Sequence, residues 1–245
     1  MSANQHYDAL FAGVIGQDYQ LLKLLSPLAV EMSRLVGLTI ASAAATSEHP
    51  LQVVELGTGT GITTLAILSQ HDNLSVFSID NEPVMQNQAK QHLHAWTTQQ
   101  KLTFCDEDAL TALQAMPSAS VDIIASAYTL HNFLEDYRAL VIIEILRVLK
   151  PGGQFINADR YAMDDISLHT RLTQEEVSGY FKVLIDVGKL DVLEHWILHI
   201  LSDESANHIM RETPALNLLK AAGFIDIKLS QRQQVNALVT ATKPS

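Results

Sequence analysis

A glycine-rich segment, residues 54–61 (VELGTGTG), contains the first residues of this sequence that could bind a ligand. Gly57, Gly59 and Gly61 follow a strand-like run and precede an apolar, helix-like run. We therefore expect a tight turn that lets a ligand approach the backbone closely. Dinucleotide sites carry Gly-x-Gly-x-x-Gly, whereas here the third glycine comes one residue early and Ile62 takes the last glycine position. The loop thus favours a nucleotide ligand other than a dinucleotide.

An acidic residue ends or follows each of three successive strand candidates. Glu55, in the first, would repel a pyrophosphate but favour a ligand with positive charge. Asp80 comes 23 residues after Gly57, at the end of the second candidate, and could accept hydrogen bonds from both hydroxyls of a ribose. Asp108 follows the third candidate, in position to meet the amino group of an adenine. S-adenosylmethionine is a nucleoside with a sulfonium and an ammonium group, so these carboxylates predict it as the ligand.

Candidate groups for acting on a second ligand follow the fourth and fifth strand candidates. His131 titrates in the range of a catalytic base, although the same residue could instead cap or orient the helix that follows it. Arg160 could hold a substrate carboxylate, or it could form an internal salt bridge. Tyr128 and Tyr161, with Tyr19 near the N-terminus, could face a sulfonium through cation–π contacts or serve in packing alone.

Two other groups of residues were considered for metal or nucleophilic chemistry. His195 and His199 are four residues apart, so both could lie on one helix face as metal ligands. Because the sequence indicates no third ligand, we predict ordinary helix residues and no metal site. Cys105 lies among acidic residues, which raise the pKa of a thiol, so core packing is the better prediction for it.

The elements that must position these residues alternate between strands and helices. Such alternation predicts βαβ units and a doubly wound, mostly parallel α/β sheet. The last two strand candidates are joined by a short polar connection, which predicts a hairpin and an antiparallel seventh strand. We divide the chain into an N-terminal helical lid (1–49) and a ligand-binding domain (50–245) with a helical insertion (162–211). The expected strands are 52–56, 75–79, 102–105, 121–126, 154–158, 225–229 and 236–240.

Composition limits the class of protein and its partners. The 245 residues include 27 acidic and 16 basic ones, for a formal net charge of -11, and lysines and arginines do not cluster. Direct nucleic-acid binding is therefore not expected. The N-terminus lacks the pattern of a signal peptide and we find no apolar run of about 18 residues, so we expect a soluble, cytoplasmic protein without membrane contact. Apolar faces in the first helix and the insertion could pair two copies into a homodimer.

Taken together, the motifs give the chain a resemblance to the class I S-adenosylmethionine-dependent methyltransferases over roughly residues 50–243. The matching segments are 54–61, 78–81, 107–109, 121–126 and 146–153. The resemblance implies a Rossmann-like fold and transfer of a methyl group from S-adenosylmethionine to a small-molecule acceptor. It also implies the cofactor-binding residues, which are Tyr19, Glu55, Gly57, Thr58, Gly59, Gly61, Asp80, Asn81, Met85, Asp108, Ala109 and Ala127.

Within that family the chain is similar to the carboxy-S-adenosylmethionine synthase branch. Segments 79–85 and 219–224 and the insertion after Tyr161 carry this likeness. Two departures separate the chain from that activity. The glycine loop differs from the Gly-Cys-Ser-Leu-Gly expected for the branch, and Phe181 and Lys182 stand about where an arginine would grip the extra carboxylate. A synthase of this kind and a non-catalytic cofactor-binding module therefore remain the alternatives, while Ile62 and Glu55 disfavour a nicotinamide-dependent oxidoreductase.

Overall fold

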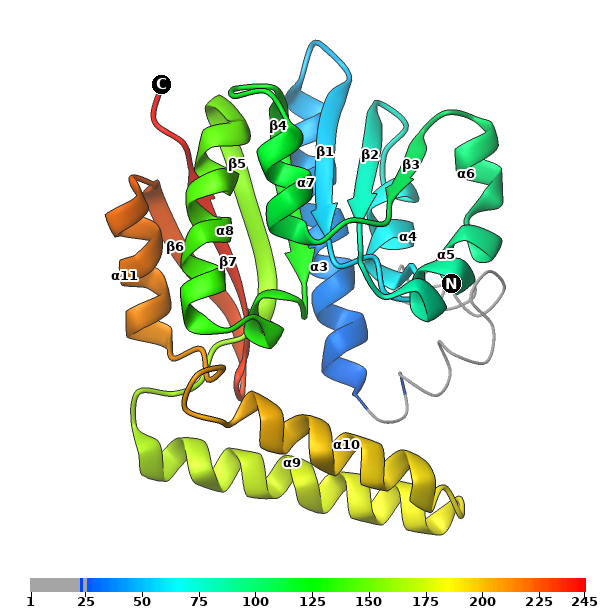
Figure 1. Ribbon diagram of the computed structural model, residues 1–245, viewed down its shortest axis with the longest axis vertical. Helices are drawn as coiled ribbons and strands as arrows, with labels where there is room; N and C mark the ends of the chain where they lie inside the picture. The colour runs from blue at the N-terminus through cyan, green and yellow to red at the C-terminus, as the bar shows by residue number, and fades with distance from the viewer. Residues whose placement is uncertain (1–22, 24–25) are drawn as a thin grey trace.

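The computed structural model describes residues 23 and 26–245, and its centre is a seven-stranded sheet (Figure 1). The strand order is β3-β2-β1-β4-β5-β7-β6, with β7 antiparallel to both neighbours. The doubly wound, mostly parallel sheet predicted from the sequence is confirmed, as is its antiparallel last strand. The strands are β1 (Leu51–Leu56), β2 (Leu74–Ile79), β3 (Leu102–Cys105), β4 (Val121–Ala127), β5 (Leu149–Arg160), β6 (Ile225–Gln233) and β7 (Asn236–Thr242).

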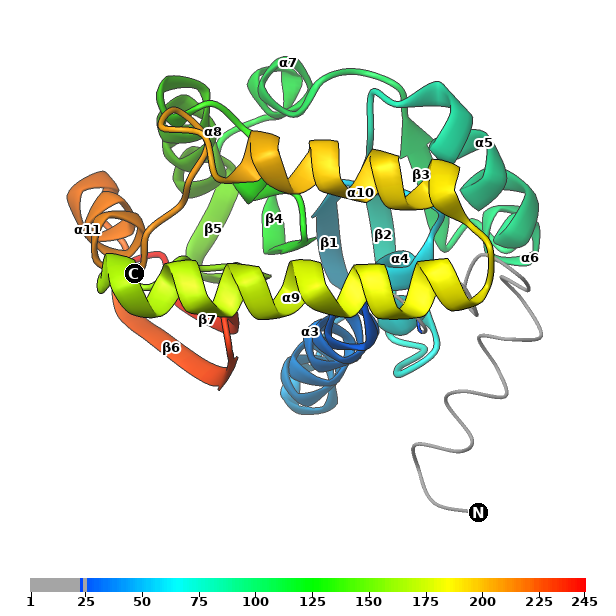
Figure 2. The ribbon, with the colours of Figure 1, turned by 90° about the horizontal axis from the view of Figure 1, so that it is seen from below.

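Helices cover both faces of the sheet because successive apolar strand residues point to opposite sides. Val53 and Ile123 pack into one core cluster, while Val54 and Ile124 pack into the other. The first face is covered mainly by α3 (Pro27–Thr46) and α4 (Ile62–Leu68), and the second by α7 (Ala109–Ala115), α8 (Glu135–Val148) and α11 (Glu212–Ala222). The helices α5 (Pro83–His92) and α6 (His94–Thr98) lie toward the β3 edge (Figure 2).

Helix α3 is part of the core of the sheet domain, although it falls within the segment predicted as a lid. The side chains of Met32, Val36 and Ile40 have no exposure to solvent. A Cβ on Gly37 would lie 2.4 Å from the Ala66 carbonyl oxygen, so this glycine permits close packing of α3 on α4. The helix is long and apolar enough to span a membrane by length and composition alone, and its buried face explains that composition. It continues to Thr46, almost to the predicted start of the ligand-binding domain at residue 50.

A helical hairpin lies across the carboxyl ends of the parallel strands (Figures 1 and 2). It consists of α9 (Ile166–Asp186) and α10 (Leu190–Asp203), within the range predicted as an insertion. The two helices pack against each other through a small apolar cluster that contains Tyr180, Leu184, Leu193 and Ile200. Ligands of open α/β sheets bind at the carboxyl ends of the strands, so the hairpin covers the expected binding site.

Candidate active site

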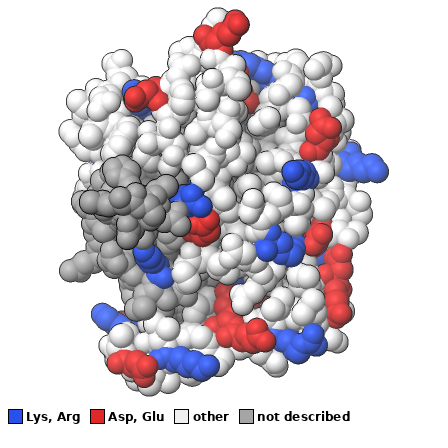
Figure 3. Space-filling model, turned by 180° about the vertical axis from the view of Figure 1, so that it is seen from behind, with Lys and Arg blue, Asp and Glu red and all other residues white. Residues whose placement is uncertain are grey.

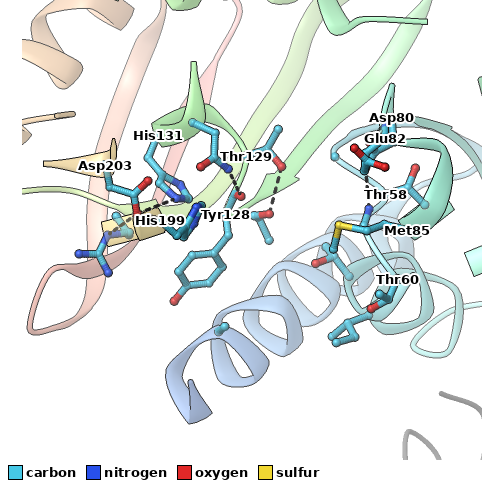
Figure 4. Close-up of a pocket in the computed structure, with 18 of the residues that line it drawn as sticks. Thr58, Thr60, Asp80, Glu82, Met85, Tyr128, Thr129, His131, His199 and Asp203 are labelled. Carbon is cyan, nitrogen blue, oxygen red and sulfur yellow. Dashed lines mark hydrogen bonds and ion pairs between the residues drawn. The ribbon is translucent and has the colours of Figure 1, made fainter. Parts of the chain in front are cut away.

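A cavity of about 750 Å³ lies between the strand ends and the hairpin. That volume falls within the roughly 300–1,000 Å³ of small-molecule sites. Figure 4 shows two ends, which we name by their residues. The loop end contains Gly57, Gly59, Asp80 and Met85, and the histidine end contains His131, His199 and Asp203. Tyr128 and Thr129, after β4, lie between them.

The three glycines of the loop have different reasons to be glycine. All have positive φ angles, of 82° at Gly57, 52° at Gly59 and 94° at Gly61. A Cβ on Gly57 would lie 1.9 Å from Oγ1 of Thr129, whereas one on Gly59 would meet only Cε of Met85 at 3.9 Å. Gly59 therefore leaves open space beside the cavity. Gly61 does not line the cavity, because a Cβ there would face Leu93 and Ala89 on the helix side.

Asp80 ties the glycine loop to the end of β2. Its Oδ2 accepts a hydrogen bond from the Gly59 amide at 2.7 Å, and its Oδ1 accepts one from the Glu82 amide at 2.8 Å. Each carboxylate oxygen has a second lone pair, so Asp80 can still accept from a pair of ligand hydroxyls. The neighbouring residues Asn81 and Met85 line the same end of the cavity, as do Thr58, Ala109 and Ala127.

Asp108 lines the cavity and also begins a helix that the sequence analysis did not predict. Its Oδ1 accepts hydrogen bonds from the Thr111 and Leu110 amides at 3.1 Å each, which caps α7. The hydroxyl of Tyr137 donates to the same oxygen at 2.8 Å. Hydrogen bonds from Thr111, and then from Tyr137 and Leu110, lower the pKa of Asp108 despite partial burial. A carboxylate is thus maintained at the edge of the loop end.

Glu55 lies behind the site, contrary to the prediction that it faces the ligand. The residue has no solvent exposure, and its Oε2 accepts hydrogen bonds of 2.6 Å from Thr64 on α4 and from Ser78 on β2. Burial is the main cause that raises its pKa to about 7. Ser78 Oγ is in turn 2.6 Å from Oγ1 of Thr58, which does line the cavity. Glu55 therefore reaches the loop only through two hydroxyl groups.

His131 is fixed at the other end by a buried carboxylate. It lies on the short 3-10 helix η1 (Leu130–Asn132), with Nδ1 2.6 Å from Oδ1 of Asp159 at the end of β5. Burial opposes ionisation of Asp159, but the His131 ring, the Arg160 backbone amide and the Arg138 charge lower its pKa below the usual range. Since a carboxylate can only accept, Nδ1 carries a proton, and in the neutral ring Nε2 then presents a lone pair. That lone pair can accept a proton or bind a metal ion.

Of the two alternatives for Arg160, a substrate contact or an internal salt bridge, the structure shows the salt bridge. Its Nη1 lies 2.8 and 2.9 Å from the two carboxylate oxygens of Glu176 on α9. Burial works to lower the pKa of Arg160, but attraction to Glu176 raises it overall. Tyr180 donates a further 2.7 Å hydrogen bond to Glu176. Arg160 does line the cavity, but its charge is already paired.

The three tyrosines proposed as ligand contacts do not share one location. Tyr128 lines the cavity, donates a 2.7 Å hydrogen bond to Oδ1 of Asn236 and has a φ of 52°, which is strained for a tyrosine. Tyr161 is only 2% exposed and accepts from the Asn157 amide at 2.8 Å, so it belongs to the core and not to the cavity. Tyr19 lies outside the described residues.

Several cavity residues on the hairpin were not singled out for the site by the sequence analysis. Glu176, Tyr180, Trp196 and Asp203 all line the histidine end. Of these, Asp203 could have been recognised from the sequence, because His199 and Asp203 are four residues apart on α10 and so share one helix face. In the sequence, we considered His199 as a pair with His195 instead. The structure brings His131, His199 and Asp203 together, with one ligand atom of each within 4.8 Å of the others.

Comparisons with known proteins agree with this geometry. Residues 53–153 match a family described as a methyltransferase domain. The chain is 24% identical over 180 residues to a carboxy-S-adenosyl-L-methionine synthase of Cronobacter sakazakii, covering 71% of this chain and 67% of that protein. It is also 24% identical over 154 residues to the synthase of an Enterobacter strain, covering 60% and 61% of the two chains.

Solved structures show the same fold at low sequence identity. An O-methyltransferase family protein from Burkholderia thailandensis has a TM-score of 0.64 and 16% identity, covering 100% of this chain and 61% of its own. The CurJ carbon methyltransferase has a TM-score of 0.65 and 16% identity, covering 96% of this chain and 61% of its own. The chain thus spans about three fifths of the length of these two proteins. Residues 53–153 thus carry the predicted likeness to a methyltransferase domain, and these solved structures share the predicted fold.

The loop end fits S-adenosylmethionine by its own geometry. The space beside Gly59 admits a ligand close to the backbone, and Asp80 retains lone pairs for the ribose hydroxyls. Asn81, Met85, Asp108 and Ala109, which the resemblance assigns to the adenine, all line the cavity. Among the predicted cofactor residues, Glu55 and Gly61 act from behind this surface.

Proposed function

We propose that the chain transfers the methyl group of S-adenosylmethionine to a small-molecule acceptor bound at the histidine end of the cavity. The observation that carries this proposal is the continuity of the cavity from Asp80 to His131 beneath the hairpin. S-adenosylmethionine supplies a methyl group on a sulfonium: transfer forms a bond to the acceptor atom, breaks the carbon–sulfur bond and leaves S-adenosylhomocysteine and, from a neutral acceptor, a proton.

The chain's own contribution is to align the acceptor and to exclude water. Correct orientation of two reactants lowers a barrier by about 7–11 kcal/mol. Tyr128 lies between the two ends and Tyr180, on α9, lines the histidine end, so both supply flat apolar surface to the cavity. We assign removal of the acceptor's proton to the cluster of His131, His199 and Asp203. This assignment keeps the predicted catalytic role of His131.

Charges at the histidine end favour a neutral or cationic acceptor over a carboxylate. Arg160 is held by Glu176, and Asp203 and Glu204 add two further carboxyl groups near it. On the rear face of the molecule, basic and acidic side chains are interspersed (Figure 3). That distribution does not favour a nucleic-acid acceptor.

Turnover with defined acceptors tests the proposal. Purified protein is incubated with methyl-labelled S-adenosylmethionine and a panel of neutral and cationic molecules bearing O–H, S–H or N–H groups, with carboxylates as a matched panel. We expect S-adenosylhomocysteine to form with members of the first panel. Binding of the cofactor without consumption in any mixture would indicate a non-catalytic binding module, and absence of cofactor binding would refute the proposal outright.

A second measurement separates the synthase alternative, which is the activity named for the curated relatives. A carboxymethyl group on the sulfonium would need a cationic partner in the cavity, but Phe181 and Lys182 do not line it and Arg160 is paired. The mass of the nucleoside that copurifies with the protein distinguishes a methyl from a carboxymethyl group.

A further inference from the structure

We propose that His131, His199 and Asp203 form a binding site for a divalent transition-metal ion such as Zn²⁺. The role of that ion in catalysis rests on the proposed function, because the three groups occupy the end of the cavity assigned to the acceptor. Metal binding itself is measurable without an acceptor or a cofactor.

The distances are those of groups that converge on a common point. Nε2 of His131 and Nε2 of His199 each lie 3.7 Å from Oδ2 of Asp203. A separation of 3.7 Å is too long for a hydrogen bond. Zinc bonds of about 2.0–2.2 Å at tetrahedral angles place two ligand atoms roughly 3.3 Å apart. The side chain of His199 is 38% exposed, so it is free to make the small rotation required.

The environment of His131 is that of a metal-bound imidazole. Metal-binding histidines commonly donate their second ring N–H to a carboxylate, which fixes the tautomer and the direction of the free lone pair. The 2.6 Å contact between Nδ1 of His131 and Asp159 provides this support. In Figure 4 the rings of His131 and His199 and the carboxyl group of Asp203 lie together at one end of the cavity.

The carboxyl group of Asp203 has no close hydrogen-bond donor among the described residues. Its side chain is 7% exposed, and it accepts no hydrogen bond from any of the residues that the structure describes. Its nearest nitrogen atoms, on His131, His199 and Arg160, all lie 3.7–3.8 Å from Oδ2. A buried carboxylate without donors is unfavourable, and a bound cation removes that penalty.

The surrounding charge also favours a cation despite the nearby arginine. The carboxyl groups of Asp159, Asp203, Glu176 and Glu204 contact this cluster or its immediate partners, against the guanidinium groups of Arg138 and Arg160. With neutral histidines this leaves an excess of two negative charges, which a divalent ion balances. Glu176 holds Nη1 of Arg160 at 2.8 Å, so the guanidinium has its own anionic partner.

The ligand set indicates both the class of metal and its use. Two imidazoles and one carboxylate suit zinc, iron and similar divalent ions, and three protein ligands leave coordination positions open toward the cavity. An open position beside the acceptor would lower the pKa of a bound O–H or S–H group. The structure thus assigns the acceptor to molecules with an ionisable hydroxyl or thiol.

Titration with Co²⁺ tests the site directly. The full-length protein is stripped with a chelator, dialysed and titrated while the visible absorption of protein-bound Co²⁺ is recorded. We expect one equivalent to bind, and His199→Gln or Asp203→Asn to weaken binding by about 100-fold or more. His195→Gln is the matched control, because that ring stacks on His199 at 6.5 Å but is not one of the three groups. Its Co²⁺ affinity and spectrum should match those of the wild type.

Two results would overturn the inference. One is Co²⁺ binding that is absent, or equally strong in His199→Gln and Asp203→Asn, which would leave only adventitious sites. The other is full turnover by stripped protein that falls on addition of Zn²⁺, because His131 would then act without a metal. Calorimetric titration with S-adenosylmethionine is run in parallel on the stripped protein. Loss of cofactor binding there would refute the proposed function and leave the cobalt result independent.

Discussion

Nδ1 of His131 lies 2.6 Å from Oδ1 of Asp159, a carboxyl group with no solvent exposure. The backbone amides of Leu130 and Arg160 donate to the same carboxyl group at 3.0 and 2.8 Å. Asp159 is therefore immobilised by η1, which follows β4, and by the end of β5 itself. The direction of the His131 ring is set by the pairing of two neighbouring strands, although the two residues are 28 positions apart in sequence.

Asp159→Asn should impair the histidine end while leaving the loop end intact. An asparagine amide can donate to Nδ1, which moves the ring proton to Nε2 and removes the lone pair that faces the cavity. We expect turnover, and Co²⁺ affinity, to fall by about 10- to 100-fold. The dissociation constant for S-adenosylmethionine, measured by calorimetry, should stay within about twofold. A parallel loss of cofactor affinity would show that Asp159 supports the whole fold and has no special part in positioning His131.

Asp80→Asn should weaken cofactor binding. The variant keeps the shape of the side chain but replaces one charged acceptor with a donor, so about 1–3 kcal/mol of binding free energy is lost. Calorimetry should therefore show an affinity roughly 5- to 150-fold lower. Asp106→Asn is the matched control: this exposed carboxylate pairs with Lys90 and does not line the cavity. Equal affinities in the two variants would contradict the assigned role of Asp80.

The glycine loop offers a comparison between two substitutions of the same kind. Gly57→Ala should destabilise the protein strongly, because the new Cβ would lie 1.9 Å from Oγ1 of Thr129 in addition to the left-handed φ. Gly59→Ala carries only the backbone cost, about 1–2 kcal/mol, since its Cβ meets nothing closer than 3.9 Å. Urea unfolding of the ligand-free proteins measures both free energies. A Gly59→Ala variant as unstable as Gly57→Ala would show that the loop packs differently.

The sequence was most informative where local patterns decide the structure. Alternation of strands and helices predicted the sheet, and the positions of Asp80 and Asp108 at successive strand ends predicted that both would reach one cavity. Local patterns do not record which face of a strand a polar side chain occupies. Glu55 was placed toward the ligand from its charge, but Ser78 and Thr64 supply hydroxyl donors on the buried face.

The histidine end was the least predictable part because its members come from distant segments. His131 follows β4, Asp159 ends β5, and His199 and Asp203 lie on α10. Only the fold of the hairpin over the strand ends brings them together. For Arg160, the sequence could not choose between a substrate contact and a salt bridge, since Glu176 becomes its neighbour only when α9 packs above β5.

Glu55→Gln should change how stability depends on pH. Burial raises the pKa of Glu55 from 4.5 to about 7, so the folded protein binds a proton more tightly than the unfolded chain does. The favourable contribution of the protonated form is therefore complete below pH 4.5 and is lost as pH rises to about 7. Its total size is on the order of 3 kcal/mol.

Glutamine resembles the protonated carboxyl group at every pH, so the variant should lack this loss. Urea unfolding at pH 5 should give free energies for the two proteins that differ by less than about 1 kcal/mol. At pH 8 the wild type should be less stable than the variant by about 2–3 kcal/mol. Glu175→Gln, which alters an exposed glutamate on α9, controls for the change in net charge. If the wild type and Glu55→Gln lose stability in parallel between pH 5 and 8, Glu55 is already ionised in the folded protein and the hydroxyls of Ser78 and Thr64 suffice to hold its charge.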